Sequence, residues 1–299
     1  MRFAGELAAL ATAVCWASGA NLFAAAAHRL GPIVLNRLRL AFGLAFLALA
    51  LLVLRGSPWP TWATPYQLAV LAVSGLIGFI FGDGWGFRAI MILGPGRATL
   101  VLSLAPLFTL LLAWPILGEH PGPLVLVGMT LLLGGLAWVL LERVQETHEH
   151  PAGSIRLGIL AATLAALGQA GGYVLSKLAL RTGIDPLSAT VVRVTAATLA
   201  MWGWAAMRGQ VAPTLRAARA DRGGTLFAAG GAFAGPFLGV TLSLLALEYV
   251  EAGVAASITA FFPVLTILIA KKFHHEPITP RLILGALIAV AGVIVLFLR

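Results

Sequence analysis

Ten long apolar runs make up almost the whole chain, and short breaks rich in glycine, proline and charge separate them. The runs cover residues 4–27, 32–54, 66–93, 97–116, 122–141, 155–179, 186–207, 224–248, 253–270 and 280–298. A helix needs about 20 apolar residues to cross the hydrocarbon core of a bilayer. Each run is close to that length, so the pattern predicts ten transmembrane helices joined by short connections.

The composition excludes a soluble globular protein. Of the 299 residues, 60% are hydrophobic and 10% are charged, whereas soluble proteins average about 45–50% apolar and about 25% charged residues. The net charge of +9 comes from scattered basic residues rather than from a dense basic tract with interleaved aromatics. We therefore expect a lipid bilayer as partner and no nucleic acid.

The second half of the chain repeats the first. An offset of 157 residues relates identical residues at Gly78/Gly235, Gly82/Gly239, Gly96/Gly253, Pro106/Pro263, Thr109/Thr266, Glu119/Glu276, Gly128/Gly285 and Gly135/Gly292. An offset of 154 relates Pro32 to Pro186 and Arg39 to Arg193. The most polar connector, from Glu142 to Arg156, divides the runs into two sets of five. We predict two repeats, at residues 1–145 and 146–299.

Five spans in each repeat is an odd number, so the second repeat enters the membrane from the opposite side to the first. The expected fold is an all-α polytopic membrane protein with ten transmembrane helices in two inverted five-helix repeats. Alternating-access transport is commonly built on such an arrangement. Fold alone does not fix function, so the residues must carry the rest.

Asp83 is the one acidic residue deep within a predicted span. The other ten acids lie in connectors or near span ends. An ionisable group at this depth costs on the order of 3 kcal/mol unless it faces water or a partner. Two interpretations stay open: a carboxylate that binds substrate or protons, or a structural ion pair with Arg88 or Arg39.

Equivalent helices of the two repeats contain residues that weaken a helix, and we expect hinges there. Glycine costs roughly 1 kcal/mol relative to alanine inside a helix, and proline removes a backbone donor. The alternative is close helix packing through small residues. The expected hinge residues are Gly78, Gly82, Gly84 and Pro106 in the first repeat, and Gly235, Pro236, Gly239 and Pro263 in the second.

Polar residues inside spans are the candidates for lining a substrate cavity. On the sixth span Gln169, Tyr173 and Lys177 share one helix face, with Lys177 near enough to an interface to snorkel. Arg37, Arg39 and Arg193 are also expected to reach the headgroups. The expected cavity residues are Trp16, Asn21, Asp83, Trp85, Ser103, Gln169, Tyr173 and Ser257.

No metal, cofactor or catalytic site is expected. The clusters at His148, Glu149 and His150 and at 274–276 are interpreted as solvated connectors without a full ligand set. The sequence contains no Walker loop, no dinucleotide fingerprint and no Ser/His/Asp constellation. The chain is therefore not expected to be an enzyme.

The repeated segment resembles a known family. It reads Leu-Ala-Pro106-Leu-Phe-Thr109 through Gly118-Glu119, and again Phe-Phe-Pro263-Val-Leu-Thr266 through His275-Glu276. This is similar to the EamA domain of the drug/metabolite transporter superfamily, present as two units. The resemblance implies a cavity formed by spans 1, 3, 4, 6, 8 and 9, bending of helices 3, 4, 8 and 9, and export of amino acids or other metabolites across a bacterial inner membrane.

The basic residues complicate the orientation. The resemblance implies cytoplasmic termini, which would place five basic residues inside and twelve on the opposite side. The positive-inside rule favours the reverse orientation. Both orientations stay open.

The leading hypothesis is a secondary transporter that exports a small molecule, expected to be an amino acid, through a cavity open alternately to each side. An integral-membrane enzyme acting on a lipid-linked substrate is the alternative, and a passive channel is a third interpretation. The sequence gives no indication of oligomeric state.

Overall fold

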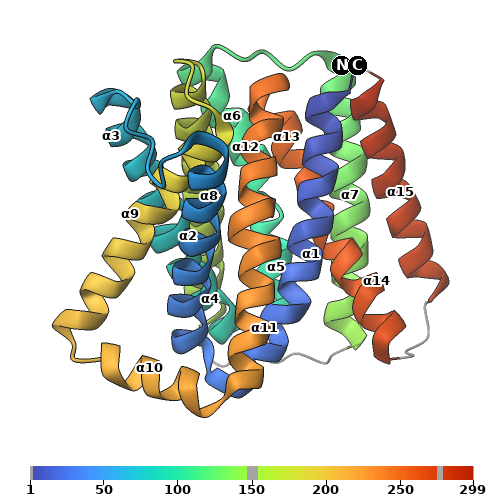
Figure 1. Cartoon of the computed structure of the whole chain (residues 1–299). Coiled ribbons are helices and arrows are strands. Elements are labelled where there is room, and N and C mark those ends of the chain that lie inside the picture. Colours follow the sequence, from blue (N-terminus) through green and yellow to red (C-terminus); the bar gives the residue numbers. More distant parts are fainter. Residues whose placement is uncertain (1–2, 147–153, 275–278, 299) are drawn as a thin grey trace.

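The computed structural model describes residues 3–146, 154–274 and 279–298, and all regular secondary structure in these ranges is helical (Figure 1). The first repeat contains α1 (Ala4–Leu30), α2 (Pro32–Arg55), α3 (Pro65–Gly75), the π-helix η1 (Leu76–Gly82), α4 (Asp83–Leu93), α5 (Pro95–Leu102), α6 (Ala105–Leu117) and α7 (Pro123–Glu146). Segments α3, η1 and α4 form the third span, and α5 and α6 form the fourth.

The second repeat contains the same spans and one additional short helix. Its elements are α8 (Ile155–Leu180), α9 (Pro186–Met207), α10 (Val211–Ala220), α11 (Arg222–Ala232), the π-helix η2 (Phe233–Gly239), α12 (Val240–Tyr249), α13 (Ala252–Thr259), α14 (Phe262–His274) and α15 (Pro280–Phe297). The eighth span joins α11, η2 and α12. The ninth span joins α13 and α14.

Nine helices of the described ranges are long and apolar enough to cross a membrane. The tenth expected span, α9, has 22 residues but contains more polar side chains. These polar side chains are buried inside the protein: Ser188, Thr190, Arg193 and Thr198. The prediction of a polytopic all-helical membrane protein is confirmed, and α9 is the span whose polar residues face the protein interior.

The helix irregularities repeat with the sequence. The π-helices η1 and η2 begin at Leu76 and Phe233 and end at Gly82 and Gly239, so both ends are related by the 157-residue offset. The interruptions between α5 and α6 and between α13 and α14 are related in the same way. π-helical segments are rare and are frequently found at functional sites. Their occurrence at equivalent positions shows that both repeats share this irregularity.

Polar caps fix where several helices begin. Thr64 accepts a hydrogen bond from the N–H of Gln67 and Asp221 accepts one from Gly224. Asp185 and Thr279 cap α9 and α15 in the same manner. Such side chains satisfy amide groups that a helix leaves unpaired at its N-terminus. Thr64 and Asp221 are related by the 157-residue offset, so the duplication extends to the caps.

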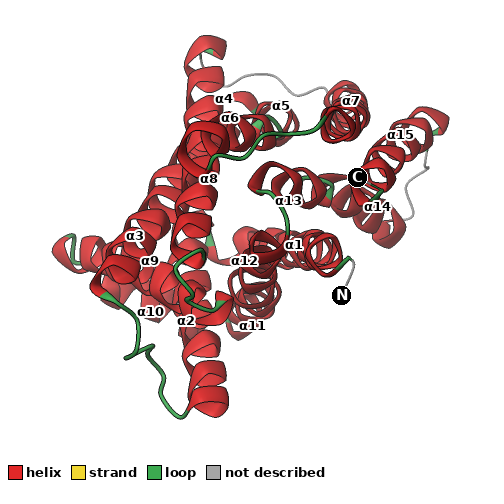
Figure 2. Cartoon of the chain, turned by 90° about the horizontal axis from the view of Figure 1, so that it is seen from above, coloured by secondary structure: helices red, strands yellow, loops and turns green. Residues whose placement is uncertain are grey.

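Helices α7 and α15 run side by side at one end of the molecule, while α2, α9 and α10 lie at the other end (Figures 1 and 2). A Cβ atom added to Gly135 would lie 2.4 Å from the backbone nitrogen of Ala289, and one added to Gly292 would lie 2.4 Å from that of Leu132. Glycine thus allows the two backbones to approach closely, as small residues do in membrane helix pairs.

The inner helices of the described residues pack differently at the two faces of the molecule. At the face that carries both termini, α6 packs against α13, and α12 packs against α8 and α9. On the opposite face, α4 and α5 pack against α8, whereas α11 and α14 pack against α1. Among the described residues these two groups have no extended packing with each other. The inner helices are therefore held together mainly at the terminus face.

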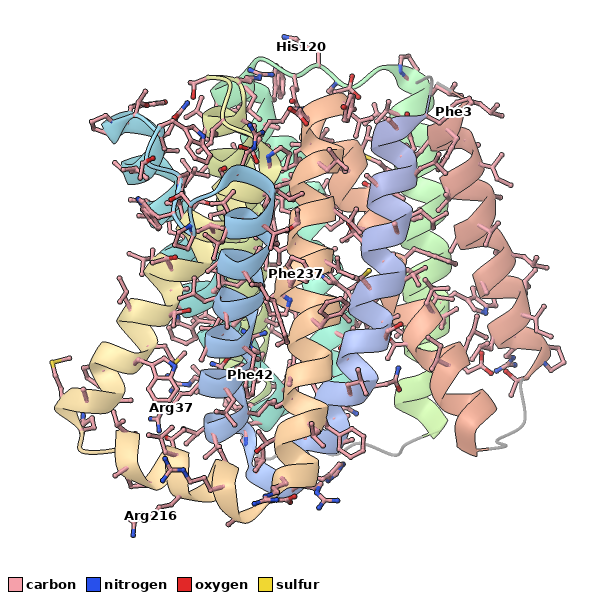
Figure 3. The ribbon with its side chains drawn as sticks, viewed as in Figure 1. Phe3, Arg37, Phe42, His120, Arg216 and Phe237 are labelled. Carbon is pink, nitrogen blue, oxygen red and sulfur yellow. The ribbon has the colours of Figure 1, made fainter. Side chains whose placement is uncertain are left out.

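Helix α10 crosses the face opposite the termini (Figure 1). Arg37 of α2 donates hydrogen bonds to Thr214 of α10, at 2.8 Å, and to Gln210. Figure 3 shows Arg37 and Arg216 on this face and His120 on the other. Arg37 is buried, so it is tied to α10 rather than extended to the headgroups as expected.

Candidate functional site

Asp83 forms an ion pair with Arg39, which settles which of the two expected arginines it meets. Asp83 begins α4 directly after η1, and Nη2 of Arg39 in α2 donates to its Oδ2. Nε of Arg39 donates to Oδ1 of Asn36 at 2.6 Å. The side chains of Arg39 and Asp83 are 16% and 20% exposed. The pair is therefore partly buried, and its carboxylate is not fully closed off from solvent.

Arg193 is buried without an ion pair or a hydrogen bond to its guanidinium group in the described part of the chain. Its relative exposure is 5%, and its Nε has no hydrogen-bond partner. The guanidinium carbon lies 5.2 Å from the centre of the Phe79 ring. A Cβ atom on Gly78 would lie 3.4 Å from Nη2. The prediction that this side chain reaches the headgroups is wrong. Arg193 lies two helical turns beyond Pro186, the first residue of α9, and is buried there.

Three hydroxyl groups from three helices lie next to Arg193 or to one another. The Tyr173 hydroxyl on α8 lies near those of Ser243 on α12 and Thr259 on α13, and it interacts electrostatically with Arg193. A Cβ atom on Gly172, next to Tyr173, would lie 3.3 Å from Cα of Gly78, the glycine that also neighbours the Arg193 guanidinium. The Tyr173 hydroxyl and Oγ1 of Thr259 are both buried without a hydrogen-bond partner. Ser243 donates to the carbonyl oxygen of Val240 at 2.8 Å. We call Tyr173, Arg193, Ser243 and Thr259 the arginine–hydroxyl cluster.

The charges near the cluster do not balance. Asp83 is the acidic group that interacts electrostatically with Arg193, but it is already paired with Arg39. Two guanidinium groups and one carboxylate leave one net positive charge. A charged side chain within a membrane costs on the order of 3 kcal/mol on insertion scales unless it is compensated. The cluster is therefore electrostatically suited to an anionic ligand.

A second polar group closes the terminus face. Oε1 of Glu119, which follows α6, lies 2.6 Å from Nζ of Lys177 and 3.4 Å from Nη2 of Arg181. Its Oε2 accepts a hydrogen bond of 2.7 Å from the backbone N–H of Ala252, the first residue of α13. We call Glu119, Lys177 and Arg181 the terminus-face latch. It joins the fourth, sixth and ninth spans at one point.

Lys177 is buried in this latch. The sequence led us to expect that its side chain extends to an interface, and the structure differs from that expectation. Its Nζ also donates to the carbonyl oxygen of Val250 at 2.5 Å. Helices α3, α8, α12 and α13 also share an apolar core, which includes Leu71, Val174, Leu244 and Ile258. Tyr173 packs against this core. Apolar packing and the latch together close this side.

The other residues expected to line a cavity are placed in several environments. Trp16 packs against η2: a Cβ atom added to Gly239 would lie 2.4 Å from the Trp16 ring. The Trp16 ring also meets the ring of Phe262 edge-on, with 5.7 Å between the ring centres. Asn21 donates to the carbonyl of Ala17 within its own helix. Gln169 is exposed, one turn from Tyr173.

Ser103 and Ser257 bond to their own helices. The Oγ atom of Ser103 donates to the carbonyl oxygen of Leu100 at 2.6 Å, and that of Ser257 donates to the carbonyl oxygen of Gly253 at 2.7 Å. Ser257 is fully buried. Their donor capacity is used locally, so a ligand would meet them as acceptors.

Trp85 lies apart from the cluster. The Arg88 guanidinium lies 5.2 Å from its ring centre. Trp85, Arg88, Ile80, Phe81 and Gly84 line a pocket of about 190 Å³. Arg88 thus stacks on Trp85, and Arg39 takes the carboxylate of Asp83. Asp83, which pairs with Arg39, is not among the residues that line this pocket.

The expected hinge residues coincide with the helix irregularities. Gly78 and Gly82 lie in η1, and Gly84 follows in α4. Gly235, Pro236 and Gly239 lie in η2. Pro106 and Pro263 are each the second residue after a break, in α6 and α14. The geometry provides places to bend, and bending itself stays a prediction.

Within the described residues no group of three metal-ligating side chains occurs. The candidate ligands His148, Glu149, His150, His275 and Glu276 lie outside those residues.

Four residues that the structure makes prominent were not expected at the site: Arg193 and Lys177, which were expected near the interfaces, and Ser243 and Thr259, which were not predicted at all. A signal existed for Arg193, since it is the repeat mate of Arg39 and lies too far into its helix to reach an interface. Ser243 and Thr259 gave no signal, because isolated hydroxyl residues are common in membrane helices and usually bond to their own backbone.

Comparison with known proteins supports the same fold. The family described as the EamA-like transporter family matches residues 3–141 and 156–298. A solved structure described only as a crystal structure of a protein is similar with a TM-score of 0.76 and 19% identity, over 99% of this chain and 98% of the other. No functionally curated protein shows significant similarity. At this identity the structural match supports the fold alone.

Proposed function

Because this chain belongs to the EamA-like transporter family, a multi-pass membrane transporter family, we propose that it is a secondary transporter that moves a small metabolite by alternating access. The observation that carries the proposal is the position of the arginine–hydroxyl cluster. It lies between a terminus face closed by packing and the latch, and an opposite face where the inner helices lack extended packing with each other.

The inverted repeats supply the second conformation. If each half adopts the other's arrangement, the packing of α6 with α13 is replaced by packing between α5 and α14, and the closed face changes sides. The repeated π-helices and proline-containing breaks are the places where the third, fourth, eighth and ninth spans change direction. Breaking the latch is part of the same step, because Glu119 holds three of the spans together.

We propose amino acids as the substrate class and export across a bacterial inner membrane as the direction, on the resemblance described above. The site is compatible with this class, because Arg193 supplies a cation and Asp83 supplies a carboxylate. The sequence contains no nucleotide-binding loop, so an ion or solute gradient would drive the flux. Asp83 is the deep carboxylate available for coupling to protons.

Counterflow in liposomes tests the proposal. Purified protein would be reconstituted with unlabelled amino acids, nucleosides or sugar phosphates inside, and entry of the labelled compound would be followed. We expect saturable accumulation of at least one amino acid. Non-saturable equilibration would instead indicate a channel, and a chemically altered product without directional flux would indicate an enzyme. Absence of flux for every class would overturn the proposal.

Proton coupling has its own test. An Asp83→Asn variant should lose proton-driven accumulation while it keeps exchange. Full proton-driven accumulation by this variant would remove Asp83 from coupling.

A further inference from the structure

We propose that Arg193, Tyr173 and Thr259 form a binding subsite for the carboxylate group of the transported molecule. The inference rests on the proposed transport function and names the chemistry of its substrate. It places the recognition residues on the seventh, sixth and ninth spans, so the subsite is completed only when these three helices meet.

The first support is that three polar groups at one place lack partners. Arg193 is 95% buried, and its Nε, the Tyr173 hydroxyl and Oγ1 of Thr259 are all buried without a hydrogen-bond partner within 3.5 Å, although the Tyr173 hydroxyl lies near those of Ser243 and Thr259. Leaving one buried donor or acceptor unpaired costs about 1–3 kcal/mol, and more for a charged group. Three such groups near one another on separate helices indicate a site completed by a ligand.

The second support is the contrast with the repeat mate. Arg39 and Arg193 are related by the 154-residue offset, and the guanidinium of Arg39 binds Asp83 and Asn36. The repeat mate of Asp83 is Val240, at the offset of 157. The second repeat therefore keeps the arginine and lacks the acid. A substrate carboxylate would take the place of the missing acid.

The third support is the geometry of the donors. A guanidinium presents its N–H groups in a planar fork that matches the two oxygens of a carboxylate. Phe79 packs against this plane at 5.2 Å, which restricts its rotation. The hydroxyl groups of Tyr173 and Thr259 each have a proton to donate. One carboxylate thus has enough acceptors to satisfy all three side chains.

The charge count favours a single negative charge. Arg39, Asp83 and Arg193 leave one net positive charge, which lies at Arg193, and the carboxylate group of a ligand neutralises that charge locally. The ammonium group of an amino acid lies outside this count. A phosphate group of charge near −2 would leave a net negative charge within the membrane, which is costly. We therefore assign the subsite to a monocarboxylate rather than to a phosphate ester.

Ligand-induced thermal stabilisation of the purified protein tests the assignment, because a ligand that binds only the folded state raises the unfolding temperature. The probes are L-amino acids, the matched amino-acid amides, the matched amines and inorganic phosphate. We expect stabilisation by at least one acid and a weaker effect, by roughly 10- to 100-fold in affinity, for its amide. Equal stabilisation by acid and amide in the unmutated protein would overturn the proposal.

Three variants separate the contributions of Arg193 and Tyr173 to carboxylate binding. Arg193→Gln should abolish the preference for acid over amide, Arg193→Lys should retain a reduced preference, and Tyr173→Phe should weaken acid binding by a few-fold. Arg88→Gln is the matched control, because Arg88 lies on Trp85 and away from the cluster. An unchanged preference in Arg193→Gln would contradict the assignment.

The failures of the two proposals are distinguishable. Counterflow of amides or other uncharged compounds without counterflow of acids would keep the transport function and overturn the subsite. Stabilisation by acids that depends on Arg193, together with no counterflow of any compound, would keep the subsite and overturn the transport function.

Discussion

The two repeat-related arginines occupy equivalent places in one architecture and have opposite environments. Arg39 donates to a carboxylate and to an amide oxygen. Arg193 packs on an aromatic ring, and within the described residues its guanidinium has no hydrogen-bond partner. The π-helices and the breaks in the fourth and ninth spans coincide between the repeats, while the polar side chains beside them do not. The duplication thus preserved the helix irregularities and allowed the polar side chains to diverge.

The largest expected effect on the free energy of unfolding comes from removing Asp83, the acidic partner of Arg39. Asp83→Asn leaves Arg39 uncompensated, and breaking a buried pair in this way costs about 3 kcal/mol of unfolding free energy. Arg193→Met removes a charge that has no partner, so stability should stay the same or rise. Unfolding of the detergent-solubilised variants measures both. Equal losses in the two variants would contradict the comparison.

A double-mutant cycle tests more sharply whether Arg193 can pair with an acid as Arg39 does. Val240→Asp places an acid at the repeat mate of Asp83, and alone this acid should be stabilised by Arg193. In an Arg193→Met background the same acid is unpaired. The two substitutions should show a coupling free energy of about 1–3 kcal/mol. Additive effects would show that Arg193 and position 240 do not interact as Arg39 and Asp83 do.

A steric difference between the repeats gives a smaller effect. A Cβ atom on Gly43 would lie 2.6 Å from Cβ of Pro236 in η2. The repeat mate of Gly43, at the offset of 154, is Ala197, which is fully buried. Gly43→Ala should cost about 1–3 kcal/mol through overpacking, measured by the same unfolding assay. A neutral Gly43→Ala would mean that α2 moves away from η2 without penalty.

The smallest effect concerns the repeat-related caps Thr64 and Asp221. Hydrogen bonds from Arg29 at 2.7 and 2.8 Å, and from the N–H of Gly224, lower the pKa of Asp221 to about 2. A lowered pKa stabilises the folded state above the ordinary pKa of 3.8, and this contribution is lost as pH falls toward about 2.

The unfolding temperature should therefore differ more between wild type and Asp221→Asn at pH 6 than at pH 2.5. Thr64→Ala removes an uncharged cap, and its cost of about 1 kcal/mol should be similar at both pH values. A difference for Asp221→Asn that does not shrink at low pH would show that the carboxylate charge is not responsible.

Much of the fold could be predicted because a membrane imposes strong rules on sequence. Apolar length set the spans, and the identical pairs such as Pro106/Pro263 showed the duplication. The positions of the helix irregularities were also predictable, because glycine and proline act locally, whereas their action as hinges stays a prediction. The boundary between repeats, at residues 145 and 146, stays a prediction.

The site was less predictable because it depends on long-range partners. The sequence offered both Arg39 and Arg88 to Asp83, and only the packing of α2 against its neighbours selects Arg39. Glu119 appeared to be a connector residue, yet its partners Lys177 and Ala252 lie far away in the chain. Residue depth alone could have separated Arg193 from arginines that reach the headgroups.

Distances across the two faces test alternating access most directly. In a Cys15→Ser background, spin-label pairs would be placed at His120 and Glu251 on the terminus face, and at Arg88 and Leu226 on the opposite face. Conditions that support counterflow should produce a population in which the first distance lengthens while the second shortens. Both distances changing in the same direction, or neither changing during transport, would contradict the account.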